Sequence, residues 1–484
     1  MNKKLYESFI NEQDIELLHT NIIKVLTQIG IKFEYEPALE YFVKHGFKTD
    51  GDLVFITEKQ LFDSLKTVPQ TFNLWGYNGN EVTVGVTEDN SSVIAPGNGC
   101  DIVQDFDGKY RRTTTADVVN FMKLHDTSDV VDIVSLQAMD SPGIEGKTEN
   151  TLLSQISLML KYSHKPIFSP ILPTLHNCKM SVSEGIRKGI NICREFYGVD
   201  DKMVLYTGCC VLSPLTVSKD VLEYFMTVIK ENQPLHITCC SMTNLTAPCT
   251  LMGSIVQDCA NELALVVLSQ LINPGSPVIL TDLSGTTDMR TVQLCIGSPE
   301  FSLMAYAHMA LAKYYKIPTR SAGALSDSID TDYQASCEST IGLMTALLSD
   351  DDIVPFAAGV LGSFNILSYS KYILDEEVIR YILRLKEGLD ISDKKSMFNQ
   401  LIEIGPRGYF MAGRTPKEYR QEHLLPKIFN RAGSTEDVRE NLISLTERSK
   451  KEYKNRIESY ALPELDKSQK ILLNQFLPER YECK

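Results

Sequence analysis

The chain has 484 residues, of which 43% are hydrophobic and 23% are charged, so it has ample apolar material for a folded core and is not expected to be disordered. Its 48 basic and 62 acidic residues give a formal net charge of −14. This balance disfavours nucleic acid and anionic membrane surfaces as partners, and it suits a cationic substrate.

The N-terminal stretch MNKKLYESFINEQDIELLHTNIIKVL begins basic, but acidic and polar residues interrupt the apolar run that a secretory signal needs. No later run reaches the ~18 apolar residues of a membrane span. The 12 cysteines are scattered, and several lie in strand-like runs such as HITCCSM, so we interpret them as reduced core residues. We therefore expect a cytoplasmic protein that binds neither membranes nor nucleic acid.

Residues 1–90 are predicted to form a helical leader followed by a small irregular or β segment. From residue 91, short apolar, β-rich runs recur about every 30–45 residues, and most intervals contain a helix-like segment such as TLLSQISLMLKY. The runs are SSVIAPG, DIVSLQAMD, KPIFSP, KMVLYTGCC, PLHITCCSM, SPVILTDLSG, KIPTRSAG and DIVPFAAG. This repeated alternation predicts a (β/α)₈ TIM barrel.

A doubly wound open sheet is the alternative, because periodicity does not show whether a sheet closes. No G-x-G-x-x-G or G-x-x-x-x-G-K-[ST] phosphate loop follows any run, which removes the commonest nucleotide-binding use of that fold. We expect three parts: an N-terminal helical or irregular segment (1–90), the barrel (91–400), and a C-terminal extension packed on the barrel (401–484).

The stretch SAGALSDSIDTDYQASCEST, residues 321–340, follows the predicted strand KIPTRS. Thr331 and Gln334 fit a capping box, with Thr331 as the N-cap of the next helix and Asp332 in its first turn. Asp327 and Ser328 have no such role. They lie in the strand-to-helix loop at the carboxyl end of the barrel, where barrel enzymes build their sites.

Familiar catalytic motifs are missing: the chain has no H-E-x-x-H, C-x-x-C or G-x-S-x-G. His236 and Cys239 have zinc-like spacing, but residues i and i+3 on a strand point to opposite faces, so we predict no metal site. The pairs Cys209–Cys210 and Cys239–Cys240 are interpreted as core residues, with a reactive thiol as the alternative.

Further candidates stand at predicted strand ends: Asp140, Phe168, Tyr206, Asp282 and Phe356. Aromatic residues at a barrel mouth can hold a quaternary ammonium by cation–π attraction, although each is also explained by ordinary packing of the barrel wall.

Two arginines offer a different chemistry. Arg290 in GTTDMRT and Arg320 in PTRS can hold a substrate carboxylate in a two-pronged bond, or each can pair with a neighbouring loop acid.

Several ordered segments resemble the trimethylamine methyltransferase superfamily. They are GNGCDIVQDFDGKYRRTTTADVVNF, SMTNLTAPCTLMGSIVQDCANELALVVLSQLINPGSPVI, TTDMRT, IPTRSAGALSDSIDTDYQASCE, SYSKYILDEEVIR and EIGPRGYF, which together cover roughly residues 90–430. The resemblance implies a (β/α)₈ barrel that passes a methyl group from a methylated amine to the Co(I) corrinoid (cobalamin) of a separate protein, within anaerobic one-carbon metabolism. The trimethylamine enzymes carry pyrrolysine, whereas this chain has only the twenty standard residues. It is therefore similar to the non-pyrrolysine branch, which demethylates quaternary amines such as glycine betaine, proline betaine or carnitine.

The chain departs from the family pattern at Ala322 and Ala324 around Gly323, where Gly-Gly is usual. It also departs at Ser370, where Glu is common, and at Arg414, where His is common. These departures leave the identity of the amine open.

The resemblance implies that Co(I) displaces a leaving group that is already charged, so the protein has only to align the reactants and needs no acid or base residue. We expect Asp327, Ser328 and Asp282 as polar wall, Tyr206, Phe168 and Phe356 as an aromatic cage, and Arg290 as the carboxylate anchor. The expected partners are a quaternary amine, a cognate corrinoid protein and further copies of the chain, with no tightly bound cofactor. The alternatives are a metal-dependent lyase or hydrolase on a barrel, and a non-catalytic binder of betaines or of corrinoid protein.

Overall fold

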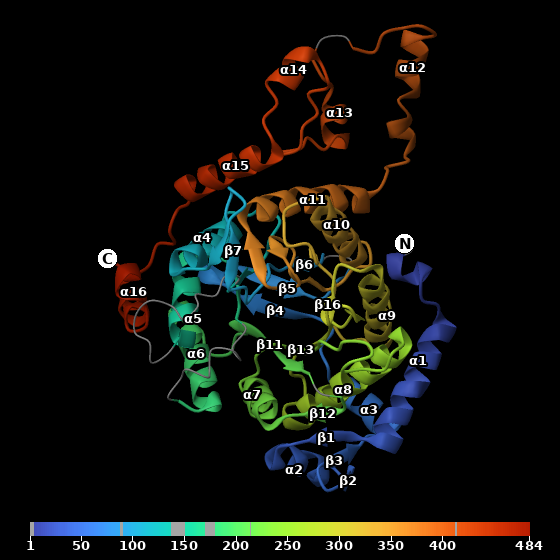
Figure 1. The fold of residues 1–484 in the computed structure, drawn as a ribbon, viewed down its shortest axis with the longest axis vertical. Coiled ribbons are helices and arrows are strands. Elements are labelled where there is room, and N and C mark those ends of the chain that lie inside the picture. Colours follow the sequence, from blue (N-terminus) through green and yellow to red (C-terminus); the bar gives the residue numbers. More distant parts are fainter. Residues whose placement is uncertain (1–3, 88–90, 137–150, 170–179, 213, 412–413) are drawn as a thin grey trace.

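The computed structural model describes residues 4–87, 91–136, 151–169, 180–212, 214–411 and 414–484. Its centre is a ring of eight parallel strands (Figure 1). In chain order they are β6 (Val93–Ile94), β9 (Val134–Ser135), β10 (Ile167–Phe168), β11 (Leu205–Val211), β13 (Leu235–Cys239), β14 (Val278–Asp282), β17 (Thr319–Arg320) and β18 (Ile353–Val354). They hydrogen-bond in the order β6-β18-β17-β14-β13-β11-β10-β9. The Asp132 N–H donates to the Ile94 carbonyl (2.9 Å) and joins the two ends of this series. The predicted barrel is therefore confirmed, and the open sheet is not the fold.

Helices surround the ring (Figure 1). They are α4 (Thr115–Asp126), α5 (Thr151–Tyr162), α6 (Val182–Tyr197), α7 (Lys219–Lys230), α8 (Leu251–Ile272), α9 (Pro299–Tyr315), α10 (Tyr333–Leu347) and α11 (Tyr369–Glu387). Strand residues alternate between the barrel interior and this helical layer. On β11, Leu205 packs in the core between strands and helices, whereas Tyr206 packs with side chains inside the barrel.

The N-terminal segment forms a second layer outside α8. It contains α1 (Glu12–Lys24), α2 (Glu36–Lys44), α3 (Glu58–Leu65) and the strands β1 (Ile31–Phe33), β2 (Lys48–Asp50) and β3 (Leu53–Phe55). These strands form one sheet with β12 (Thr216–Val217), in the order β12-β1-β3-β2. Among the described residues, α8 is the one helix long and apolar enough to span a membrane. Most of it is buried because α1, α2 and α3 pack on it, so we interpret it as a core helix.

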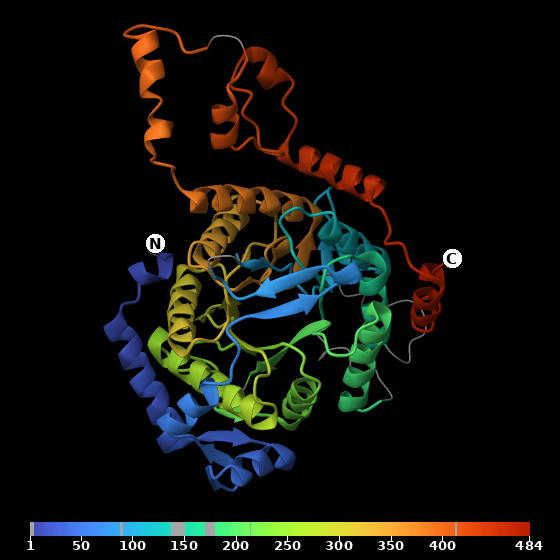
Figure 2. The same ribbon diagram turned by 180° about the vertical axis from the view of Figure 1, so that it is seen from behind.

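A hairpin of β4 (Phe72–Trp75) and β5 (Glu81–Val84) closes the amino end of the barrel and lies in front of it in Figure 2. The Trp75 N–H donates to the Met203 carbonyl (2.8 Å), just before β11 begins. Phe72, Leu74 and Val84 pack on the residues inside the barrel. The hairpin therefore covers the amino end, and we expect a ligand to enter the barrel interior from the carboxyl end.

Short strands form the rim of that carboxyl end. β7 (Ile102–Gln104), β8 (Tyr110–Arg112), β19 (Val360–Leu361) and β20 (Ile366–Ser368) make one small sheet, and β15 (Thr286–Asp288) pairs with β16 (Gln293–Cys295). These strands belong to the loops that follow β6, β18 and β14.

Beyond α11 the chain leaves the barrel. α12 (Phe398–Ile404), α13 (Lys417–Glu422) and α14 (Glu436–Glu440) project from it (Figures 1 and 2), and the chain returns as α15 (Leu445–Ser459) along α11 and α4, followed by α16 (Lys467–Asn474) on α6. The expected packing of the C-terminal extension on the barrel thus applies to α15 and α16, whereas α12, α13 and α14 project away from it (Figure 1). The division of the chain into domains at residues 90 and 400 stays a prediction.

Candidate active site

The centre of the candidate site is Arg320, which points from β17 into the barrel and is 1% exposed. Its guanidinium carbon lies over two aromatic rings, 5.7 Å from the centre of Phe168 and 5.4 Å from the centre of Phe356. Nε and Nη1 have no hydrogen-bond partner among the described residues. Burial lowers the pKa of Arg320, but an arginine remains cationic in a folded protein. The barrel thus encloses a positive charge whose donors are free for a ligand.

Three further rings share this space. The ring of Phe168 lies 4.8 Å from that of Tyr206, and the His236 ring lies 5.5 Å from Phe168 and 5.4 Å from Tyr206. Gly208 makes room for His236, because a Cβ at Gly208 would lie 2.0 Å from the imidazole. Burial raises the pKa of Tyr206 and lowers that of His236, so both are neutral at pH 7.

We call Phe168, Tyr206, His236, Arg320 and Phe356 the Arg320 site. The Tyr206 hydroxyl and the His236 Nδ1 find no hydrogen-bond partner in the described part of the chain. Buried polar groups are normally bonded, so these atoms mark a place prepared for a ligand or for water. The sequence predicted Phe168, Tyr206 and Phe356 here, and the structure brings them together.

Further polar side chains line the same interior. By strand alternation Thr238 and Thr281 point inward, and both hydroxyls lack a partner among the described residues. Cys210 and Cys240 contact each other close to Arg320, and this contact together with burial raises the pKa of the Cys240 thiol well above its ordinary value. This environment favours a thiol rather than a reactive thiolate at Cys240.

Asp282 does not join this group. It points outward from β14 toward α8 and α9, where its Oδ1 accepts from the Ser284 N–H (2.8 Å). Burial, reinforced by the nearby acids Asp258 and Glu262, raises its pKa to about 7 even though His308 opposes the shift. The prediction that Asp282 lines the substrate pocket therefore needs correction, because this residue has the opposite strand parity to Ile279, which faces the barrel interior.

Asp327 joins three rim loops at the barrel mouth. Its Oδ1 accepts from the Ile296 N–H (3.0 Å) and the Ser363 hydroxyl (2.7 Å), and its Oδ2 accepts from the Gly297 N–H (3.0 Å). Both oxygens are thus bonded within the protein. Asp327 lies at the mouth, as predicted, but its hydrogen bonds indicate that it holds the rim loops in place.

The next helix begins one residue later than predicted. Asp332, not Thr331, is the N-cap of α10, since its carboxylate accepts from the Ala335 N–H (2.8 Å) and from the Ser328 hydroxyl (3.0 Å). Thr331 instead donates to Gln104 (3.1 Å). Asp and Thr are both good N-caps, so the sequence alone did not separate them.

Arg290 lies on the β15–β16 hairpin with 90% of its side chain exposed, and it pairs with Asp288 (2.6 Å). Arg290 therefore forms a structural ion pair, which was the alternative prediction for this residue. The position of Arg290 does not support the prediction that it anchors a carboxylate, whereas Arg320, the other candidate, lies inside the barrel. Asp140 lies outside the described residues.

The departures from the family pattern lie in different places. Ala322 and Ala324 are buried at the end of β17, where the intervening Gly323 has a Pro355 carbonyl so close that a Cβ would meet it at 1.7 Å. The Ser370 hydroxyl contacts that of Ser449 (2.7 Å) between α11 and α15, and Arg414 is exposed on the projecting segment.

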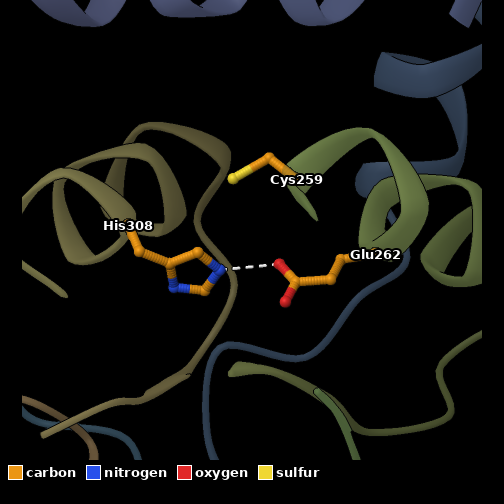
Figure 3. A group of neighbouring side chains, drawn as sticks. All are labelled: Cys259, Glu262 and His308. Atoms are coloured by element: carbon orange, nitrogen blue, oxygen red, sulfur yellow. Dashed lines mark hydrogen bonds and ion pairs between the residues drawn. The ribbon is translucent and has the colours of Figure 1, made fainter. Parts of the chain in front are cut away.

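A separate buried group combines Cys259 and Glu262 of α8 with His308 of α9 (Figure 3). Their possible ligand atoms all lie within 4.8 Å of one another, a combination that zinc accepts. However, Nε2 of His308 and Oε2 of Glu262 are only 2.6 Å apart and share a hydrogen bond, as the dashed line in Figure 3 marks. Burial raises the pKa of Glu262 and lowers that of His308, which favours a neutral pair. No local sequence motif marks this group, because its members come from two helices.

A closed parallel barrel that is covered at its amino end, and whose interior holds polar groups without partners among the described residues, has the architecture of a (β/α)₈ enzyme. A model of the family described as trimethylamine methyltransferase (MTTB) matches residues 2–483, and the chain belongs to this family of methyltransferases. The L-carnitine:corrinoid methyltransferase of Eubacterium limosum is 47% identical over 100% of this chain and 99% of its own length. The proline betaine:corrinoid methyltransferase of the same organism is 42% identical over 99% of each chain. The glycine betaine methyltransferase of Desulfitobacterium hafniense (strain Y51) is 31% identical over 98% of this chain and 97% of its own length.

Among solved structures, the monomethylamine methyltransferase MtmB of Methanosarcina barkeri has a TM-score of 0.52 at 14% identity, over 94% of this chain and 90% of the other. At this identity the likeness supports the fold alone.

Proposed function

We propose that this enzyme transfers a methyl group from a quaternary amine that also carries a carboxylate to the Co(I) corrinoid of a separate protein. The activities for which the three relatives are named support the reaction class. The observation that carries the substrate class is the buried guanidinium of Arg320, with donor atoms that have no partner among the described residues.

Carnitine, proline betaine and glycine betaine share two chemical features, a carboxylate and a nitrogen with a permanent positive charge. A buried guanidinium is costly unless an anion pairs with it, and a carboxylate matches its planar fork of donors. Phe168 and Phe356 lie against the guanidinium, so the carboxylate has to approach its free edge. The Arg320 site thus selects an amine with an anionic group.

Binding in this orientation also places the methyl group. With the carboxylate on Arg320, the quaternary nitrogen extends toward the mouth, because the β4–β5 hairpin closes the amino end. A corrinoid protein docked at the mouth then faces the methyl carbon in line with the departing nitrogen. The nitrogen leaves as a neutral tertiary amine, so the protein aligns the reactants without supplying a proton.

Within this proposal Phe168, Tyr206 and Phe356 line the substrate space, while Asp327 and Ser328 act by positioning the rim loops.

We further propose a cytoplasmic homo-oligomer without a tightly bound cofactor, active in anaerobic one-carbon metabolism. The negative net charge is the support for excluding nucleic acid and membrane surfaces as partners. The relatives give no support to a lyase, a hydrolase or a non-catalytic binder.

The test uses the full chain with a corrinoid protein reduced to Co(I). We expect the methyl-Co(III) spectrum to appear with carnitine, proline betaine or glycine betaine, and not with choline or tetramethylammonium, which have a quaternary nitrogen but no carboxylate. Methylation from choline at the rate of the best betaine would contradict the carboxylate part of the proposal. If no quaternary amine methylated any Co(I) corrinoid protein, the reaction class itself would fail.

A further inference from the structure

The segment that projects from the barrel, residues 388–411 and 414–444, has an unusually apolar surface. We call it the arm. About two fifths of the exposed large hydrophobic side chains in the described part of the chain belong to it, although it makes up about a ninth of the sequence. They are Leu389, Ile391, Met397, Phe398, Leu401, Ile402, Tyr409, Phe410, Met411, Tyr419, Leu425, Leu442 and Ile443.

The apolar side chains of α12 share one face. Phe398, Leu401 and Ile402 follow the spacing i, i+3, i+4, and they are 63%, 51% and 64% exposed. Ile391 before the helix is 91% exposed, and Met411 after it is 73% exposed. A helix of this length gains stability mainly by packing its apolar face, yet in the described chain more than half of each of these three side chains is exposed.

The arm is nevertheless fixed to the body at its base. Ile428 is buried, and Glu377 of α11 accepts from the Lys427 N–H (2.8 Å). Asp129, beside α4, pairs with both Lys427 and Arg380. The arm is therefore held out from the barrel in a defined direction by these contacts, as Figures 1 and 2 show.

Two grooves lie where the arm meets α11 and α15. One has a volume of about 450 Å³ and is lined by Tyr381, Phe429, Leu442, Leu445 and three polar residues, among them Arg448. The other has a volume of about 480 Å³, and its apolar lining is Tyr381, Leu385, Leu389 and Leu424. The same chain thus presents protruding apolar side chains and apolar grooves next to each other.

We infer that the arm is the interface with a second copy of this chain, and that each copy packs the apolar face of its α12 on the arm and grooves of the other. A surface that carries both protrusions and grooves can be self-complementary, which is the requirement of a two-fold symmetric dimer. Its exposed large side chains amount to roughly 1,000 Å², above the ~800 Å² per partner of a standard stable interface.

The position and composition of the arm favour a second copy over the corrinoid protein. The β4–β5 hairpin, at the amino end of the barrel, lies in front in Figure 2, and the arm projects to the side in both views rather than over the mouth. A corrinoid protein that delivers and collects methyl groups must also dissociate, whereas strongly apolar interfaces are typical of permanent homodimers.

The test is the oligomeric state of the full chain, measured by analytical ultracentrifugation without amine or corrinoid, so its outcome is independent of the proposed reaction. We expect a wild-type dimer and a monomer for the double variant Phe398→Glu, Leu401→Glu, with an unchanged circular dichroism spectrum. The matched control is Ile471→Glu on α16, whose side chain is also 58% exposed but lies far along the chain from the arm, and it should remain dimeric.

Hydrogen exchange on the wild type gives a second readout that needs no variant. Backbone amides of residues 397–411 should exchange slowly at concentrations where the dimer forms and quickly after dilution to the monomer. A monomeric wild type, or an arm variant that stays dimeric, would overturn the inference. A folded arm variant that remains dimeric but no longer methylates the corrinoid protein would assign the arm to that partner instead.

Discussion

The guanidinium carbon of Arg320 lies 5.7 Å from the centre of the Phe168 ring, although the two residues come from opposite strands of the barrel. In the closed strand order, β17 and β10 are four places apart in either direction. Arg320 therefore reaches across the barrel interior and forms a charged floor, above which only the space toward the mouth remains for a ligand. In the proposed binding mode, this floor sets both the depth of the substrate space and the end at which the carboxylate binds.

Replacing Arg320 tests this arrangement. We expect Arg320→Gln to reduce kcat/KM for carboxylated quaternary amines by about 10- to 150-fold, mostly through KM, since a charge-assisted hydrogen bond contributes about 1.5–3 kcal/mol. Arg320→Lys keeps the charge but loses the planar fork, so an intermediate loss is expected. Steady-state methylation of the corrinoid protein gives both constants.

Arg290→Gln is the matched control, because Arg290 is highly exposed and paired with Asp288, and its kinetics should equal those of the wild type. A fall in kcat at unchanged KM for Arg320→Gln would show that Arg320 acts on the fold or on the reaction step, not on substrate binding.

The sequence predicted the barrel well. Eight regularly spaced apolar runs were enough for the fold, and the aromatic residues Phe168, Tyr206 and Phe356 chosen at strand ends do lie together inside the barrel, while their role as a substrate cage stays a prediction. The error at Asp282 has a physical cause: barrel strands are apolar on both faces, so the sequence pattern does not show which parity points inward. The sequence also contained a sign that separates the two arginines. Asp288 stands two residues before Arg290 and indicates a local ion pair, whereas the neighbours of Arg320 in PTRS are small or apolar. The unsatisfied hydroxyl of Tyr206 and the imidazole of His236 become visible only when distant strands are brought together.

The acidic loop at the mouth gives a second prediction. Asp332→Ala removes the N-cap of α10 and should lower the free energy of unfolding by about 0.5–2 kcal/mol while activity persists. Asp327→Ala leaves the N–H groups of Ile296 and Gly297 without their acceptor, so we expect a stability loss of about 1–3 kcal/mol together with reduced turnover as the rim loops shift. Thermal melts and turnover assays on both variants measure this. Lost turnover at full stability in Asp327→Ala would instead indicate direct contact of this carboxylate with the substrate.

The raised pKa of Asp282 predicts a pH dependence of stability. The fold raises this pKa from 3.8 to about 7, mainly by burial, so the folded chain holds a proton that the unfolded chain releases near pH 4. The stability contributed by this proton is complete below about pH 4 and is lost as the pH rises through about 7. The raised pKa values of Asp258 and Glu262 act in the same direction, while the lowered pKa of His308 acts in the opposite direction.

Asp282→Asn removes this titration. Relative to the wild type, the variant should gain on the order of 1–3 kcal/mol of stability between pH 5 and pH 8, since one unit of pKa shift corresponds to about 1.4 kcal/mol. Denaturant unfolding at several pH values measures the difference. Parallel curves for the two proteins would show that Asp282 is ionised in the folded chain throughout this range.

Metal analysis tests the buried group in α8 and α9. We expect the purified enzyme to contain no stoichiometric zinc and to keep its activity in the presence of a chelator, because the hydrogen bond between His308 and Glu262 already joins the atoms that a metal would need. Cys259→Ser should remain active. If elemental analysis found one zinc per chain that disappears in Cys259→Ser, the group would be a structural metal site.

The last prediction is that trimethylamine is not a methyl donor. Protonated trimethylamine keeps an N–H, and once it loses that proton the neutral amine is no longer activated, whereas a quaternary nitrogen stays charged at every pH. Trimethylammonium also lacks a carboxylate, so in the Arg320 site its positive charge would face the buried guanidinium without an anion between them, which disfavours binding in this low-dielectric interior. The measurement is the methyl-Co(III) spectrum after addition of trimethylamine, over a pH range that spans the titration of this amine, with a betaine as the positive control in each sample. Methylation from trimethylamine but from none of the betaines or carnitine would show that the cation alone is recognised and that Arg320 has another role.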